Sequence, residues 1–170
     1  MESLKVATKE ELCPLVTLLR DAPKPIPFEQ FPALYEQLNW EKNRRRGGFT
    51  NYDINLPLAA VNEMRGELSR FNARVSDTIK ERGAATQAAV RAAFPEVKQS
   101  ITECIGFAPT GTPLYEEGAD WDLDDGSVIR LAVGENVLEF MFMSKMIADL
   151  ERYERRTGID LDRPMGETDA

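Results

Sequence analysis

Histidine is absent from the sequence and cysteine occurs only twice, and these two shortages exclude several classes of protein. Without an imidazole there can be no Ser-His-Asp or Cys-His arrangement that activates a nucleophile, and no zinc site that uses histidine. Cys13 and Cys104 lie far apart and form no CxxC pair, which also excludes a structural zinc site. We interpret them as two buried thiols in a reducing cytoplasm, where disulfides are rare.

Long apolar runs are missing as well. No stretch approaches the roughly 20 apolar residues that a membrane span needs, and the first residues lack the basic-then-apolar pattern of a signal peptide. What is present is a chain of 170 residues, 42% of them hydrophobic, with a formal net charge of -8. This composition predicts a soluble cytoplasmic protein with one core, no membrane contact and no cofactor.

Residues 1–106 are expected to be mainly helical. Thr8 and Glu11 have the spacing of a capping box, and apolar residues follow at helical intervals. A second helix is predicted from about residue 28 or 32 to Arg46, because cations followed by Gly47 and Gly48 are typical of a helix C-terminus.

The longest predicted helix lies between Asn55 and Gly83. Its apolar residues recur at spacings of three and four, as in a heptad seam: Val61, Met64, Leu68, Phe71, Val75 and Ile79. The next segment, 84–105, has two rows of alanines at helical spacing, and Pro95 is expected to kink or split that helix at Phe94. Since the link at Gly83 is short, we predict an antiparallel hairpin of these two helices.

After residue 118 the apolar period changes to two, which predicts β-strands. Turns at 124–126 and 135–136 give a register in which Trp121 lies opposite Ile129 and Leu131 lies opposite Phe140. In that register the large apolar side chains share one face.

The sequence therefore predicts a single α+β domain over residues 1–158. A helical hairpin and N-terminal helices (1–106) pack on a small three-stranded antiparallel meander (119–143), and a C-terminal helix (144–158) begins at the cap Ser144. Residues 159–170, which are polar and acidic, are expected to form a loosely held tail.

The lack of a recognisable catalytic set favours a non-catalytic protein that binds other proteins, such as an inhibitor, an immunity protein, an adaptor or an assembly component. We expect it to act through the helical hairpin and the outer face of the sheet. Val128, Arg130, Met141 and Met143 lie on that face, and we assign them to binding of another protein or a second copy of this chain. The alternative is that residues 144–157 cover Met141 and Met143.

Two further functions stay open. The basic cluster Lys42, Arg44, Arg45 and Arg46, together with Arg70 and Arg74, would suit nucleic acid, although the overall acidity argues against it. A metal-dependent enzyme could use Asp120, Asp122 and Asp124. We expect no metal there, because an EF-hand loop starting at Asp120 needs Gly and Glu where the chain has Asp125 and Leu131.

Overall fold

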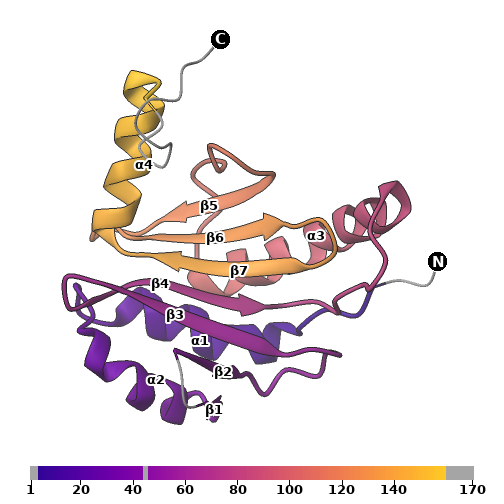
Figure 1. Ribbon diagram of the computed structural model, residues 1–170, viewed down its shortest axis with the longest axis horizontal. Helices are drawn as coiled ribbons and strands as arrows, with labels where there is room; N and C mark the ends of the chain where they lie inside the picture. The colour runs from indigo at the N-terminus through magenta and orange to yellow at the C-terminus, as the bar shows by residue number, and fades with distance from the viewer. Residues whose placement is uncertain (1–3, 44–45, 160–170) are drawn as a thin grey trace.

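The computed structural model describes residues 4–43 and 46–159, and in these residues seven antiparallel strands form one sheet (Figure 1). The strands lie in the order β1-β2-β3-β4-β7-β6-β5. The α+β class predicted from the sequence is correct, whereas three strands understate the sheet. The bounds of the strands are β1 Glu41–Lys42, β2 Gly47–Phe49, β3 Leu58–Met64, β4 Glu67–Arg74, β5 Gly118–Asp122, β6 Val128–Val133 and β7 Leu138–Met143.

Strands β5, β6 and β7 confirm the predicted meander and its register. Trp121 pairs with Ile129 and Leu131 pairs with Phe140, as expected. Gly126 has a φ of 92° in the turn between β5 and β6, a conformation that favours glycine. Because side chains alternate along a strand, the residues between these large apolar ones point to the opposite face of the sheet.

Helices α1 and α3 pack on one face of the sheet, which we call the inner face, and lie behind the strands in Figure 1. The capping box of Thr8 and Glu11 is present, and α1 begins at the next residue after Thr8. Helix α3 continues through Pro95, so the predicted split at Phe94 does not occur. The bounds of the helices are α1 Lys9–Asp21, η1 (a 3₁₀ turn) Phe28–Gln30, α2 Phe31–Gln37, α3 Ala84–Ile105 and α4 Lys145–Thr157.

The long helix predicted over residues 55–83 is wrong, because this segment contains the hairpin of β3 and β4. Arg65 and Gly66 connect the two strands, and both have a positive φ, of 53° and 79°. Two positive-φ residues make the tight turn that matches the twist of paired strands. The predicted antiparallel pair of helices is therefore wrong too, and the expected binding role of a helical hairpin has no structural basis.

The second predicted helix is too long. Helix α2 ends at Gln37, and the chain then turns at Asn39, whose φ is 59°, into the paired strands β1 and β2. Lys42 consequently lies in β1 and Arg46 directly precedes β2, so neither closes a helix. The other two arginines of the predicted basic cluster, Arg44 and Arg45, lie outside the described residues.

A disulfide bond joins Cys13 of α1 to Cys104 of α3, with the two Cα atoms 5.1 Å apart. The prediction of two free thiols is therefore wrong. The cysteines are separated by 91 positions, and the sequence gives no sign that α1 and α3 pack side by side. The bond fixes the two helices that cover the inner face to each other.

Helix α4 confirms the predicted C-terminal helix. The Ser144 side chain accepts a hydrogen bond from the backbone N–H of Ile147, and Gly158 ends the helix with a φ of 75°. The helix rises from the end of β7, away from α1 and α3 (Figure 1). The tail predicted beyond it falls, from residue 160 on, outside the described residues. None of the described helices has the length and apolar character that crossing a membrane requires.

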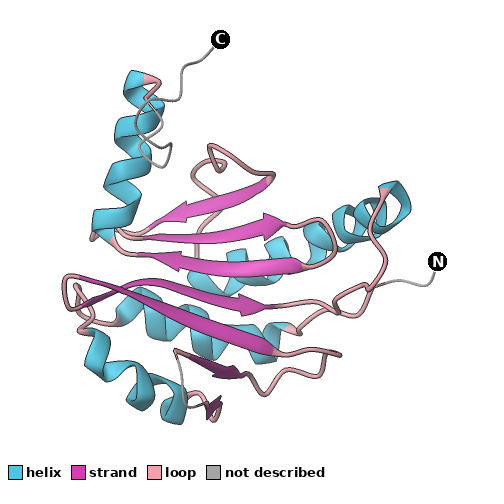
Figure 2. Cartoon of the chain, in the orientation of Figure 1, coloured by secondary structure: helices cyan, strands magenta, loops and turns pink. Residues whose placement is uncertain are grey.

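The outer face of the sheet is covered unevenly. Helix α4 packs over the ends of β6 and β7, whereas Figure 2 shows no helix in front of β3 and β4 among the described residues. We call the uncovered part the open face. Its outward side chains are Leu58, Ala60, Asn62, Arg70, Asn72, Arg74, Glu139 and Met141.

Candidate functional site

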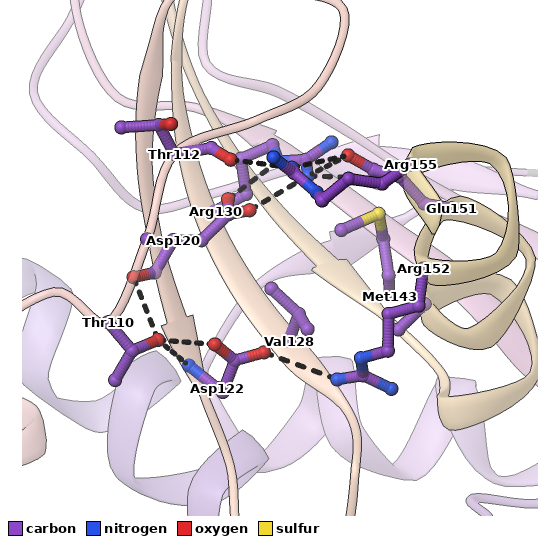
Figure 3. A pocket seen from close by; sticks show the side chains of 12 residues that line it. Thr110, Thr112, Asp120, Asp122, Val128, Arg130, Met143, Glu151, Arg152 and Arg155 are labelled. Carbon is purple, nitrogen blue, oxygen red and sulfur yellow. Dashed lines mark hydrogen bonds and ion pairs between the residues drawn. The ribbon is translucent and has the colours of Figure 1, made fainter. Parts of the chain in front are cut away.

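Helix α4 and the outer ends of β5, β6 and β7 enclose a pocket, which we call the α4 junction (Figure 3). Val128 and Met143 are buried there and pack with Ile147 and Ala148 of α4 in a small second core. The helix thus covers two side chains for which a partner surface was favoured, and this corrects that expectation. The junction is lined by Thr110, Thr112, Asp120, Asp122, Val128, Arg130, Met143, Glu151, Arg152 and Arg155, among others.

Arg130, also predicted to contact a partner, is the centre of a buried ion-pair network. Its side chain is only 7% exposed. Its Nε and Nη2 atoms donate to the two carboxylate oxygens of Asp120, at 2.7 and 2.9 Å, and Nη2 also donates to Glu151 at 2.9 Å. A weaker contact of 3.4 Å reaches Glu116. The guanidinium therefore ties β5 and β6 to α4 and is not offered to a partner.

The electrostatics of this network favour the charged forms of Arg130 and Glu151. Burial alone disfavours the charged guanidinium, but the hydrogen bonds that Arg130 donates to Asp120 and Glu151 outweigh this effect and raise the pKa of Arg130. Burial likewise pushes the pKa of the Glu151 carboxyl upward. Hydrogen bonds donated by Arg130 and by the backbone N–H of Leu114 outweigh that effect and hold this pKa below its ordinary value.

Two more arginines of α4 close the junction (Figure 3). Arg152 contacts Asp122 at 3.2 Å, and the same carboxylate is hydrogen-bonded to the Thr110 hydroxyl. Arg155 donates to the backbone carbonyl of Thr112 at 2.9 Å. All three arginines at this site therefore already have acceptors within the chain.

The pocket at the α4 junction measures about 310 Å³, but its charged side chains are bonded to one another. Asp120 and Asp122 are each paired with an arginine, which occupies the place that a cation would take. Within residues 4–43 and 46–159 no group of three or more His, Cys, Asp or Glu residues could hold a metal ion, so the candidates Asp120, Asp122 and Asp124 do not converge. The arrangement attaches α4 to the sheet.

The described part of the basic cluster is also engaged within the chain. The Lys42 ammonium lies 5.9 Å from the centroid of the Phe31 ring. Arg46 contacts Glu63 at 3.2 Å and lies 5.0 Å from the centroid of the Phe28 ring. Arg46 lies beside the open face, where it lines the same hollow as Arg74.

Sequence reasoning missed two surface residues that the structure brings beside the open face, Tyr115 and Leu150, and one largely buried residue elsewhere, Lys24. Tyr115, from the loop before β5, and Leu150 of α4 are exposed and line one groove with Arg70 and Met141. Lys24, from the proline-rich segment after α1, lies in a different pocket, near the start of α4. Tyr115 and Lys24 sit in segments without periodicity, so no sequence pattern could place them.

The lowered pKa of Glu151 makes the stability of the protein depend on pH. A carboxyl group whose pKa is lower in the folded state stabilises the fold above its unfolded pKa, here about 4.5, and loses this effect as the pH falls through the folded value. We expect the free energy of unfolding to decrease as the pH is lowered from about 7 to below about 4. In Glu151→Gln this decrease should be smaller, which urea titrations at several pH values would measure. An equally steep decrease in the variant would contradict the assignment.

In a comparison with known protein families, residues 10–144 match a family described as a family of unknown function (DUF6301). The chain belongs to this family. No curated protein and no solved structure gives a significant match.

The matched region contains the whole sheet, α1 without its first residue, α2 and α3, and it ends at Ser144. Helix α4 begins at the next residue and lies beyond the match. The outer face of the sheet therefore lies within the matched region, whereas α4, which covers the outer ends of β6 and β7, does not.

Proposed function

We propose that the protein is a non-catalytic protein-binding protein whose open face holds an acidic, partly apolar segment of a partner protein. The observation that carries this proposal is the uneven cover of the sheet. The described residues bury the outer ends of β6 and β7 under α4, and none of their helices covers β3, β4 or the middle of β7. The uncovered part bears arginines and a half-buried methionine, where a purely solvated face needs only polar side chains.

The groove between α4 and the open face has the residue types of a protein interface. It measures about 290 Å³ and is lined by Arg70, Tyr115, Met141 and Leu150. Tyr115 is 59% exposed and Leu150 is 40% exposed. Tyrosine and arginine are enriched among the residues that dominate binding energies, and methionine adapts to the shape of a partner.

The charge of the open face favours an acidic partner. Arg70 is exposed and has no carboxylate within 4.0 Å among residues 4–43 and 46–159. Arg46 and Arg74 line an adjoining hollow of about 610 Å³, together with Glu139. Burial raises the pKa of the Glu139 carboxyl, and the positive charge of Arg74 acts against that shift. Complementary charges of this kind speed association and select the partner.

Nucleic acid fits the same surface less well. Glu116, Glu151 and Glu154 line the groove beside Arg70, and a continuous phosphate backbone would meet all three. A protein segment can place an acidic side chain at Arg70 and apolar side chains at Met141 and Leu150. The net charge of -8 also opposes a polyanion.

A charge reversal at Arg70 tests the proposal. We expect Arg70→Glu to weaken partner binding at least about tenfold, because it removes the unpaired cation and adds a like charge. Lys80→Glu is the matched control: Lys80 is exposed and lies near the other end of the sheet, where Ile79 contacts Asn136. Both variants change the net charge equally and should unfold like the wild type.

The measurement combines affinity capture from the native host with titration of the purified captured protein. An acidic protein that binds the wild type and Lys80→Glu but not Arg70→Glu supports the proposal. A partner retained equally by all three proteins overturns it. So does salt-sensitive capture of DNA or RNA that Arg70→Glu abolishes, which assigns the face to nucleic acid.

A further inference from the structure

A second pocket, which we call the Lys24 pocket, lies where the proline-rich segment after α1 crosses the end of the sheet. It measures about 440 Å³, within the range of about 300–1,000 Å³ that is usual for small-molecule sites. Ile26, Leu68 and Phe142, which are nearly or fully buried, give it apolar walls. The start of α4 and the turn between β5 and β6 complete the rim. The lining thus comes from four separate parts of the chain.

Lys24 has unused hydrogen-bonding capacity in this pocket. Its side chain is only 9% exposed. An ammonium carries three N–H donors, yet among the described residues Asp125 is the one acceptor, at 2.7 Å. The ring of Phe142 lies 5.8 Å away and offers a weak cation–π contact. A buried charge with donors left over is costly unless another acceptor reaches it.

Asp125 accepts one hydrogen bond from Lys24, and Ser127 uses its other oxygen. Its Oδ1 atom accepts hydrogen bonds from the backbone N–H and the hydroxyl of Ser127, and its Oδ2 atom accepts the one from Lys24. The other lysine on the rim, Lys145, is bonded to Asp149 at 2.6 Å. The remaining donors of Lys24 are therefore available to a molecule in the pocket.

We propose that the Lys24 pocket binds a small carboxylate with an apolar body. The carboxylate accepts hydrogen bonds from the free N–H groups of Lys24, and the apolar body lies against Ile26, Leu68 and Phe142. The two lysine–aspartate pairs on the rim are neutral as pairs, and the positive end of the α4 dipole lies at the same wall. Glu67 is the one rim carboxylate without an ion pair among the described residues, and it limits the ligand to a single negative charge.

Octanoate and 3-phenylpropanoate are suitable probes, one with an aliphatic body and one with an aromatic body. We expect at least one of them to bind the full-length protein with a Kd below about 1 mM, and 1-octanol to bind at least about tenfold more weakly. Calorimetry gives the affinities. Backbone amide NMR shifts locate the site and should concentrate at Lys24, Ser127 and Met146.

Two variants separate the roles of the charge and of the cavity. Lys24→Met keeps the apolar stem and removes the ammonium, and should weaken carboxylate binding at least about tenfold. Met146→Trp fills the mouth of the pocket, leaves the Lys24–Asp125 pair in place, and should weaken binding even where Lys24→Met folds poorly. The matched control is Lys145→Met, which removes an exposed ammonium from the same rim and should leave the affinity within about threefold.

The other outcomes all overturn the proposal. One such outcome is that neither carboxylate has a Kd below about 1 mM. Another is that 1-octanol binds as tightly as octanoate, which shows that the apolar body alone accounts for binding. Binding that Lys24→Met and Met146→Trp both leave unchanged, or shifts that concentrate on the open face, place the ligand elsewhere. The proposal is independent of the partner proposed for the open face, because none of its probes or variants touches Arg70.

Discussion

Reduction of the disulfide between Cys13 and Cys104 is expected to lower the free energy of unfolding by about 4–5 kcal/mol. The bond spans 91 positions, and a cross-link that closes so long a loop removes much of the conformational entropy of the unfolded chain. Domains of this size are stable by only about 5–15 kcal/mol, so the change is a large part of the total. Guanidinium unfolding with and without a phosphine reductant measures it.

The control is the double variant Cys13→Ser, Cys104→Ser. It should unfold at the midpoint of the reduced wild type and should not respond to reductant. Peptide mapping without reduction should recover the two cysteine peptides as one linked species. Two titratable thiols in the native protein, with no effect of reductant on unfolding, would restore the free thiols expected from the sequence.

The disulfide also bears on location. The expectation of a cytoplasmic protein rested partly on reading Cys13 and Cys104 as thiols, and that support is gone. Disulfides persist mainly in oxidising compartments. The pair was hidden from sequence analysis because its two helices, α1 and α3, meet only through the tertiary fold.

The second half of the sheet, with β5, β6 and β7, could be predicted because its apolar pattern fits only one register of the strands. In β6 and β7 the residues of the inner face fall on alternate positions: Ile129, Leu131, Val133, Leu138, Phe140 and Phe142. A slip of one residue would oppose Leu131 to Glu139. The short turns at Gly126 and at residues 135–136 then fix which strands are neighbours. Local information was sufficient there, and the register was right to the residue.

The first half of the sheet, with β3 and β4, could not be predicted because its apolar pattern fits both a helix and a pair of strands. Val61, Leu68, Phe71 and Val75 are spaced as on a helix, yet all four are buried in or beside the paired strands β3 and β4. A register shift between Asn62 and Glu63 breaks the strict alternation that would have indicated strands. In the turn between β3 and β4 the residue before the glycine is Arg65, whereas Asn or Asp at that position is the usual sequence signal of a hairpin.

The candidate sites depend on contacts that no local pattern encodes. The sequence placed Val128, Arg130 and Met143 on the outer face correctly, but it could not tell whether α4 or a partner covers them. In the structure α4 covers them, packed on Val128 and Met143 and hydrogen-bonded to Arg130 through Glu151. Lys24 and Asp125 are about a hundred positions apart in the chain, and their pocket exists only after both halves of the sheet have joined.

Loss of Arg130 is expected to be the most damaging single substitution at the α4 junction. In Arg130→Met the carboxylates of Asp120 and Glu151, 11% and 16% exposed, lose their common partner. Removing one member of a buried ion pair costs about 3–5 kcal/mol, because the remaining charge stays desolvated. Guanidinium unfolding should show this loss. Amide hydrogen exchange should show α4 opening before the sheet, since Glu151 then holds nothing on β6.

Arg152→Met is the matched control, because Arg152 is 37% exposed and its contacts with Asp122 and Asp149 lie in solvent. It should cost no more than about 1 kcal/mol. The triple variant Arg130→Met, Asp120→Asn, Glu151→Gln removes the stranded charges together with the arginine, and should recover part of the lost stability. Equal costs for Arg130→Met and Arg152→Met would show that the network contributes no more than surface pairs do. In that case hydrophobic packing of Ile147 and Ala148 on Val128 and Met143 would be what holds α4 against the sheet.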